Sequence, residues 1–211
     1  GRVGVQVVLR TPGGAKGGYG PSHSQMLSNL LVGIPGIKVV APSTPAQAKG
    51  LLKSAVRDPN PVIFIENKRL YGQRGPVADG DVTLPLDRAV VRRKGRDLTI
   101  VTYSAMAPPA LQVADAVAGR GPDIEVLDRE TVFESVRRTG RVLIVEEACR
   151  TGGVGAEVSG LIAEECLDVL EGPIVRVGAA DVPIPSSIEL EKTVLPGVQD
   201  IVAGVKKVMS W

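Results

Sequence analysis

The chain has 211 residues, a mass of 22.1 kDa and a formal net charge of +2, with no long run of basic residues. This charge gives no reason to expect nucleic acid or an anionic membrane surface as a partner. No apolar stretch approaches a membrane span, and Cys149 and Cys166 lack the spacing of metal ligands. Hydrophobic residues make up 44% but aromatics only 3%, which predicts a soluble intracellular α/β protein with an aliphatic core.

Residues 1–10 are predicted to form a strand, because Val3, Val5 and Val7 alternate with small or polar neighbours. No element precedes this strand to cover its faces. We therefore expect that an N-terminal part of the protein lies outside this sequence.

Residues 11–25, TPGGAKGGYGPSHSQ, contain five glycines and two prolines. We expect a loop without regular structure, whose backbone can approach a ligand closely. The loop carries His23, the only histidine, just before a short predicted helix at 26–31. A histidine so placed suits proton transfer. From the residues alone, the structural and the catalytic interpretation of His23 are about equally supported.

Residues 37–71 predict a strand, a helix and a second strand. Thr44 suits the N-cap, and Gln47 completes a capping box by reaching back to the N–H of the cap. The apolar positions of the helix fall on one face, and Asp58-Pro59-Asn60-Pro61 ends it. Val62 to Ile65 is apolar throughout, as in a parallel strand buried on both faces.

Residues 72–85 are rich in Gly, Pro and Asp and predict a linker between two domains. The remaining predicted elements alternate: strands at 98–103, 124–127, 142–145 and 174–177, and helices at 108–118, 129–138, 156–170 and 198–209. This alternation predicts a mainly parallel sheet covered by helices on both sides. The junction between Asp128 and Arg129 is too tight for a strand followed by a helix, so we expect residues to be absent there.

Two further motifs have weak functional signals. The glycines of 152–155 precede a helix, as in some phosphate-binding loops, but close packing of loop against helix is the stronger interpretation. Glu146 and Glu147 lie at the carboxyl end of a predicted strand, and ligands of parallel α/β sheets bind beside these strand ends. No partner residue is identifiable for them, so a structural role between paired subunits is favoured.

Several segments occur together in the order of one known family: GGYGPSHSQ, GIPGIKVVAPSTPAQAKGLLKSAVRDPNPVIFIENKRLY, DLTIVTYSAMAPPAL, SVRRTGRVLIVEEACRTGGVGAEV and VRVGAADVPIPSSIELE. The chain resembles the β subunit of the thiamine-diphosphate-dependent decarboxylase component of 2-oxo acid dehydrogenases. The resemblance covers essentially all residues. It implies the C-terminal part of a pyrimidine-binding domain (1–71), a linker (72–85) and a transketolase C-terminal-type domain (86–211).

The resemblance also implies an activity. Family members decarboxylate a 2-oxo acid, pyruvate or a branched-chain acid, and pass the acyl group to a lipoyl group. Thiamine diphosphate lies between the α and β subunits, with Mg²⁺ held mainly by α. His23 matches the family's active-site histidine, which implies proton transfer during lipoyl acylation or steadying of the dithiolane. Two departures stand out: the glutamate that contacts the aminopyrimidine has no counterpart here, and a segment of the type LRTLxPLD is missing after Asp128.

Partners and a second ion are implied as well. The family's structural K⁺ corresponds to Val7, Ala55, Val56, Asp58 and Asn60, although the residues alone favour a simple turn. Glu171 and Trp211 lie where relatives dock the lipoyl acyltransferase component. The expected assembly is α₂β₂, with a second β subunit and without nucleic acid or membrane. The expected location is the cytoplasm of a bacterium or archaeon, or the mitochondrial matrix.

Two alternatives remain open. The chain could be another transketolase-like thiamine enzyme, such as a relative of deoxyxylulose-phosphate synthase, which would need no separate α chain. It could also be a non-catalytic docking or assembly module, which the missing glutamate favours. The 2-oxo acid that is used cannot be inferred from this sequence.

Overall fold

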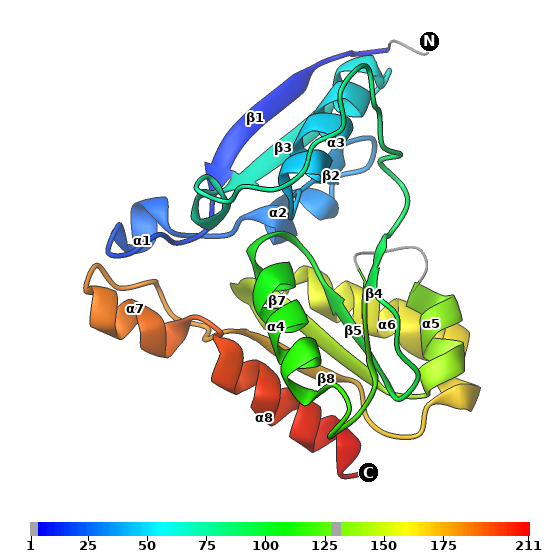
Figure 1. The fold of residues 1–211 in the computed structure, drawn as a ribbon. Helices are drawn as coiled ribbons and strands as arrows, with labels where there is room; N and C mark the ends of the chain where they lie inside the picture. The colour runs from blue at the N-terminus through cyan, green and yellow to red at the C-terminus, as the bar shows by residue number, and fades with distance from the viewer. Residues whose placement is uncertain (1–3, 128–131) are drawn as a thin grey trace.

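A computed structural model describes residues 4–127 and 132–211. The described residues form two sheets, one from the first third of the chain and one from the rest (Figure 1). The two sheets lie one above the other in this view, and the segment between β3 and β4 runs down beside them. The α/β class and the mainly parallel sheets predicted from the sequence are confirmed.

The first sheet has the order β1-β3-β2 and is parallel throughout. Its strands are β1 (Val8–Gly13), β2 (Lys38–Val40) and β3 (Val62–Asn67). The strand predicted at 1–10 therefore begins later and runs further, because β1 stays paired with β3 up to Gly13. Pro12 is tolerated there because β1 is at the edge of this sheet as described.

Helix α3 (Pro45–Arg57) covers one face of the first sheet. Thr44 is its N-cap, as predicted, and its side chain accepts a hydrogen bond from the N–H of Gln47 at 3.2 Å. The predicted capping box is wrong in one detail: the Gln47 carbonyl accepts from the N–H of Ser43, not of Thr44. The buried Gln47 side chain therefore reaches one residue further back, and it ties the incoming chain to the helix.

The glycine-rich segment is not wholly irregular, in contrast to the prediction. It contains α1 (Gly20–His23), and it is followed by α2 (Ser28–Val32). Pro21 explains this short helix, because its fixed φ suits a first helical turn and its missing N–H would have no partner there. His23 thus lies on a helical turn rather than on a free loop.

The second sheet has the order β4-β6-β5-β7-β8, and β4 is its antiparallel strand. The strands and helices of this half are β4 (Val91–Arg93), β5 (Leu98–Thr102), α4 (Ala107–Val117), β6 (Ile124–Leu127), α5 (Val132–Thr139), β7 (Val142–Cys149), α6 (Val154–Cys166), β8 (Val175–Ala179), α7 (Ile188–Val194) and α8 (Val198–Met209). Short 3-10 turns are η2 (Ser104–Met106) and η3 (Leu167–Val169) in this half, and η1 (Lys68–Leu70), which follows β3 of the first sheet. Helices α4 and α8 pack on one face, while α5 and α6 pack on the other. The sequence did not predict β4 or α7.

The segment 72–85 has no helix or strand, as predicted, but it is tied to α3. Leu84 packs over Gly50, where a Cβ would lie 2.6 Å from the Leu84 Cγ. Ser54 donates a hydrogen bond to the Leu84 carbonyl at 2.5 Å, and Lys53 and Arg57 both pair with Asp81. This segment therefore crosses between the two sheets on a fixed path.

The tight junction at Asp128 and the start of the helix expected at 129 lie outside the described residues. Of the helices in the described part, none is both long and apolar enough to cross a membrane.

Candidate functional site

The glycine-rich segment lies between the two sheets and leads to His23. It leaves the carboxyl end of β1 and reaches α1, which faces α7 of the C-terminal half (Figure 1). His23 is exposed, whereas the following Ser24 is fully buried. Lys68, which follows β3, donates to the His23 carbonyl and lies 5.3 Å from the centre of the Tyr19 ring. The histidine side chain is thus presented to solvent from a turn whose backbone is held in place.

The start of this segment at Gly14 and Ala15, here called its root, is held by a carboxylate from the second sheet. Glu147, on β7, is only 4% exposed. One of its oxygens accepts from the N–H of Ala15 at 2.7 Å, and the other accepts from the Asn67 amide at 2.7 Å. Arg69 in turn donates to the Ala15 carbonyl at 3.2 Å. Both polar backbone groups of this buried alanine are therefore satisfied, as burial demands.

The turn at Gly17 and Gly18, here called the tip of the segment, is held by a second buried carboxylate. The N–H groups of Gly17 and Gly18 donate to the two oxygens of Glu191, each at 2.9 Å. Glu191 lies on α7 and is 4% exposed. Both halves of the chain therefore fix the path that leads to His23.

Glu146, next to Glu147, points into the interior of the second half. It accepts from the N–H of Gly155 at 3.1 Å and from the Tyr103 hydroxyl at 3.4 Å, and that hydroxyl also meets Ser28 at 3.1 Å. Burial raises the pKa of Glu146, although these donors oppose the rise. Burial, together with the charge of Glu146, also raises the pKa of Tyr103. The contacts described for Glu146 and Glu147 all lie within this one chain. The role predicted for the two glutamates in a contact between β subunits therefore remains a prediction.

Two of the glycines at 152–155, Gly153 and Gly155, pack closely against this carboxylate, as the sequence analysis favoured, whereas a Cβ on Gly152 would meet nothing within 4 Å. A Cβ on Gly155 would lie 2.5 Å from a Glu146 oxygen, and one on Gly153 would lie 2.6 Å from it. The close approach of loop and strand leaves no room for side chains at either position.

A pair of glycine substitutions tests whether the root is tightly packed. Gly14 and Gly17 both have positive φ, +74° and +82°, so alanine strains the backbone at either site. A Cβ on Gly14 would lie 2.4 Å from the Asn67 amide nitrogen, whereas one on Gly17 meets nothing within 4 Å. We expect Gly17→Ala to cost about 1 kcal/mol, and Gly14→Ala about 1–3 kcal/mol more. Urea denaturation measures both, and equal losses would contradict the packing described for Gly14.

A pH experiment tests the raised pKa of Glu146. The folded-state pKa of Glu146 lies above the ordinary glutamate pKa of 4.5, so the unfolded state releases this proton first as the pH rises. The stability contributed by protonated Glu146 is present below pH 4.5 and is lost as the pH rises through the folded-state pKa. In Glu146→Gln we expect the free energy of unfolding to fall less between pH 4.5 and 8 than in the wild type. Glu189→Gln, an exposed change, is the control; if Glu146→Gln keeps the wild-type slope, the raised pKa is wrong.

The five residues predicted to bind potassium lie together where α3 ends and β1 begins, and the oxygens of Val7, Ala55, Val56 and Asp58 already accept hydrogen bonds. Lys38 pairs with Asp58 at 2.5 Å, and the other Asp58 oxygen accepts from the N–H of Asn60 at 2.9 Å. Burial raises the pKa of Asp58, but these donors outweigh it and the pKa is lowered. Gln6 donates to the Val56 carbonyl at 2.8 Å. The Lys38 ammonium thus occupies the position where a cation would meet Asp58.

The two residues predicted to bind a partner, Glu171 and Trp211, are brought together by one arginine. Arg141 pairs with Glu171 at 2.5 Å and donates to the Trp211 carbonyl at 3.3 Å. The Trp211 side chain is 67% exposed and packs over Gly172, where a Cβ would lie 3.0 Å from the Trp211 Cβ. The pair forms an exposed surface on which Arg141 holds the main chain of Trp211.

Thiamine diphosphate needs a carboxylate at its aminopyrimidine, and the described residues of this region offer none that is free. Glu66 pairs with Arg10 at 2.6 Å and accepts from Tyr71 at 3.0 Å, and its pKa is lowered, chiefly by Arg10. Glu146, Glu147 and Glu191 bond to the chain itself, as described above. The described residues also contain no group of three His, Cys, Asp or Glu placed to hold a metal ion. We therefore assign no cofactor contact to these residues.

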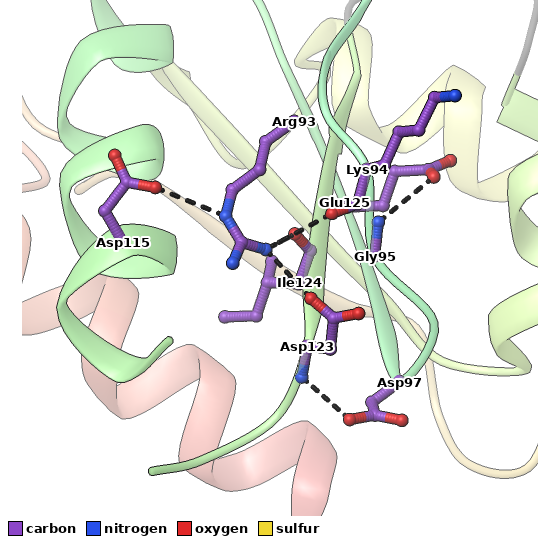
Figure 2. Close-up of polar contacts among 8 residues, drawn as sticks. All are labelled: Arg93, Lys94, Gly95, Asp97, Asp115, Asp123, Ile124 and Glu125. Carbon is purple, nitrogen blue, oxygen red and sulfur yellow. Dashed lines mark hydrogen bonds and ion pairs between the residues drawn. The ribbon is translucent and has the colours of Figure 1, made fainter. Parts of the chain in front are cut away.

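Two hollows lie elsewhere, and His23 lines neither. One, of about 390 Å³, lies beside α3 and the carboxyl ends of β1 and β3, where Arg10 and Glu66 form part of its wall. The other, of about 490 Å³, lies at the amino ends of β5 and β6. Beside it, Arg93 of β4 reaches Asp115 and Asp123, each at 3.2 Å (Figure 2). These ion pairs brace the antiparallel strand against α4 and β6, which is a structural role.

Comparison with known proteins identifies the family. Residues 87–201 match the model for the transketolase C-terminal domain, and residues 1–74 match that for the transketolase pyrimidine binding domain. The first match covers more than half of the chain. The chain belongs to the family of the transketolase C-terminal domain. Its fold agrees with a solved member, a split-gene transketolase described as an inactive beta4 tetramer, with a TM-score of 0.80 and 27% identity over 98% of this chain and 67% of that one.

Relatives within the family confirm the resemblance to decarboxylase β subunits. The chain is 40% identical over 219 residues to pyruvate dehydrogenase E1 component subunit beta-2, mitochondrial, of Oryza sativa subsp. japonica, covering 98% of the chain and 58% of that protein. It is 41% identical to subunit beta-1, mitochondrial, of Arabidopsis thaliana (98% and 60%) and 41% identical to subunit beta of Rhizobium meliloti strain 1021 (99% and 47%). The chain thus spans about half to three fifths of the length of these relatives.

The structure adds site residues that the sequence analysis missed. Glu191 was not singled out, and Glu147 was assigned to a contact between subunits. A signal for Glu191 exists in the sequence, because it is an acidic residue on the inner face of a short helix with apolar neighbours. Its partner loop lies more than 170 residues earlier, and no local pattern reveals that pairing.

Proposed function

We propose that the chain is part of the β subunit of a 2-oxo acid dehydrogenase decarboxylase, which oxidatively decarboxylates a 2-oxo acid and transfers the acyl group to a lipoyl group. The observation that carries the proposal is the identity of about 40% to pyruvate dehydrogenase E1 β subunits across 98% of the chain. Pyruvate is the substrate that these names favour. The exposed His23 agrees with a site that a second chain completes.

Thiamine diphosphate would supply the electron sink for decarboxylation. The residues of this chain would contribute orientation and proton handling. His23, at the end of a turn held by Lys68, can give or take a proton at an incoming dithiolane. The glycine segment lets a ligand approach the backbone beside it. The remaining contacts to the cofactor, and Mg²⁺, would come from an α subunit and from parts of the protein outside this sequence.

The proposal extends to organisation and partners. Residues 1–71 would belong to a pyrimidine-binding domain, 72–85 to a linker and 86–211 to the C-terminal domain. The assembly would contain two α and two β subunits and bind a lipoyl acyltransferase, in a bacterial cytoplasm or a mitochondrial matrix.

A structural K⁺ at Val7, Ala55, Val56, Asp58 and Asn60 would compete with Lys38 for Asp58. If that ion binds, the melting temperature in potassium should exceed that in tetramethylammonium, and equal values argue against it.

Acyltransferase docking makes a specific prediction for Trp211. Trp211 is 67% exposed while Arg141 holds its backbone carbonyl, so its indole suits a buried anchor in an interface. We expect removal of Trp211 to weaken binding of the acyltransferase's subunit-binding domain at least about tenfold. Lys206→Ala, an exposed change on α8, is the control. Calorimetric titration measures the affinity of both variants for the subunit-binding domain. An unchanged affinity without Trp211 would show that Trp211 does not take part in docking.

The function is tested by release of labelled carbon dioxide from carboxyl-labelled pyruvate in the presence of thiamine diphosphate and Mg²⁺. Three preparations are compared: the full β chain alone, the α chain alone and their mixture. Release only by the mixture is the expected result. Release by the β chain alone would instead identify a self-sufficient transketolase-like enzyme. If the mixture neither releases carbon dioxide nor binds thiamine diphosphate, the chain is a docking or assembly module.

A further inference from the structure

One buried carboxylate of the C-terminal half binds two neighbouring backbone N–H groups of the segment that carries His23. Glu191 accepts from Gly17 and from Gly18 with one oxygen each, both at 2.9 Å. Hydrogen bonds to an ionised acceptor are about twice as strong as neutral ones. A side-chain amide has only one acceptor oxygen, and its nitrogen would present hydrogens to the second N–H. The arrangement therefore requires a carboxylate.

The backbone of the segment is shaped for this contact. Gly17 and Gly18 have φ values of +82° and +85°, which other residues seldom adopt. A Cβ on Gly18 would lie 2.9 Å from the Ser186 carbonyl oxygen, and one on Gly20 would lie 2.4 Å from the Ser186 hydroxyl. The segment is thus pressed against the residues that lead into α7, in agreement with the facing positions of α1 and α7 in Figure 1.

Root and tip of the segment have separate anchors. Glu147 and Arg69 hold the root at Ala15, while Glu191 holds the tip at Gly17 and Gly18. His23 follows the tip by five residues, and part of that distance is α1. Loss of the contact at the tip would let the residues between Gly17 and His23 move, while the root stays attached at Ala15.

We propose that Glu191 is a positioning residue: it fixes Gly17 and Gly18 and, through them, the location of His23 relative to the other half of the chain. The inference rests on the proposed role of His23 in acyl transfer to a lipoyl group. Glu191 itself does not touch the reacting groups. A small displacement of a proton-transfer group steeply lowers the rate of the reaction that it assists. The contact of Glu191 with Gly17 and Gly18 therefore affects the rate of acyl transfer.

The first test measures the contact itself, without any assay of activity. Lys16 is exposed and directly precedes Gly17, so trypsin cleavage after Lys16 reports opening of the tip. We expect Glu191→Gln in the assembled enzyme to raise the rate of that cleavage about tenfold or more, since the substitution weakens two charge-assisted hydrogen bonds that hold the tip closed. Glu189→Gln, on the same helix and exposed, should cleave as the wild type does. Equal rates for Glu191→Gln and the wild type would overturn the proposal.

The second test separates positioning from a merely structural role. Glu191→Gln should lower kcat/KM for a lipoyl domain about tenfold in the wild-type background and should add nothing in a His23→Ala background. Equal losses in both backgrounds would show that Glu191 does not act through His23 and would overturn the proposal. If the wild type acylates no lipoyl domain, it is the proposed function that fails, and the cleavage after Lys16 still decides whether Glu191 holds the tip.

Discussion

Replacing His23 by alanine should lower acyl transfer to a lipoyl domain by about 10²- to 10⁴-fold, the range typical of a lost general acid or base. The residue is exposed and its side chain is not part of the core, so the melting temperature should stay within a degree or two of the wild type. The measurement is the rate of lipoyl-domain acylation by the variant β subunit assembled with its α partner.

A neighbouring substitution serves as the control for that experiment. Ser22 is exposed and lies on the same turn, so Ser22→Ala preserves the local helix while it leaves the imidazole in place. It should acylate the lipoyl domain at close to the wild-type rate. If His23→Ala also did so, the role assigned to the histidine would be wrong, whatever the fold of the chain.

The largest expected effect on stability comes from Phe64→Ala. Phe64 is 1% exposed on the central strand of the first sheet, where it packs with Val40, Ala55 and Val62 under α3. Truncating such a residue removes its transfer free energy and leaves a cavity, at a cost of about 3–5 kcal/mol. Urea denaturation of the variant and the wild type gives the difference.

The matched control is Leu167→Ala, because Leu167 is a large apolar residue that is 70% exposed in η3. That change should alter the free energy of unfolding by no more than about 0.5 kcal/mol. A loss from Phe64→Ala as small as this would mean that the core under α3 is not packed as described.

Local patterns predicted much of the fold because they report local physics. The N-cap at Thr44 follows from a side chain that accepts its own helix's N–H, and the closing helix has its predicted bounds of Val198–Met209. The strand at 62–65 is apolar because both of its faces are buried. Such features need only a few neighbouring residues.

The prediction failed where distant contacts decide the structure. β1 extends to Gly13 because β3 continues to pair with it, although Pro12 and Gly13 read as a loop. The buried carboxylates Glu147 and Glu191 bond N–H groups more than 130 residues away in the chain. The sequence marked His23 and its glycines as a candidate site, but only the folded chain reveals what holds them.

The measurement that tests the central claim most directly is the intact mass of a lipoyl domain after incubation with the α and β chains, pyruvate, thiamine diphosphate and Mg²⁺. The claim predicts a reductively acetylated lipoyl domain that depends on both chains and on pyruvate. Carbon dioxide released while the lipoyl domain stays unmodified would contradict it, since the enzyme would then decarboxylate a 2-oxo acid without passing the acyl group to a lipoyl acceptor.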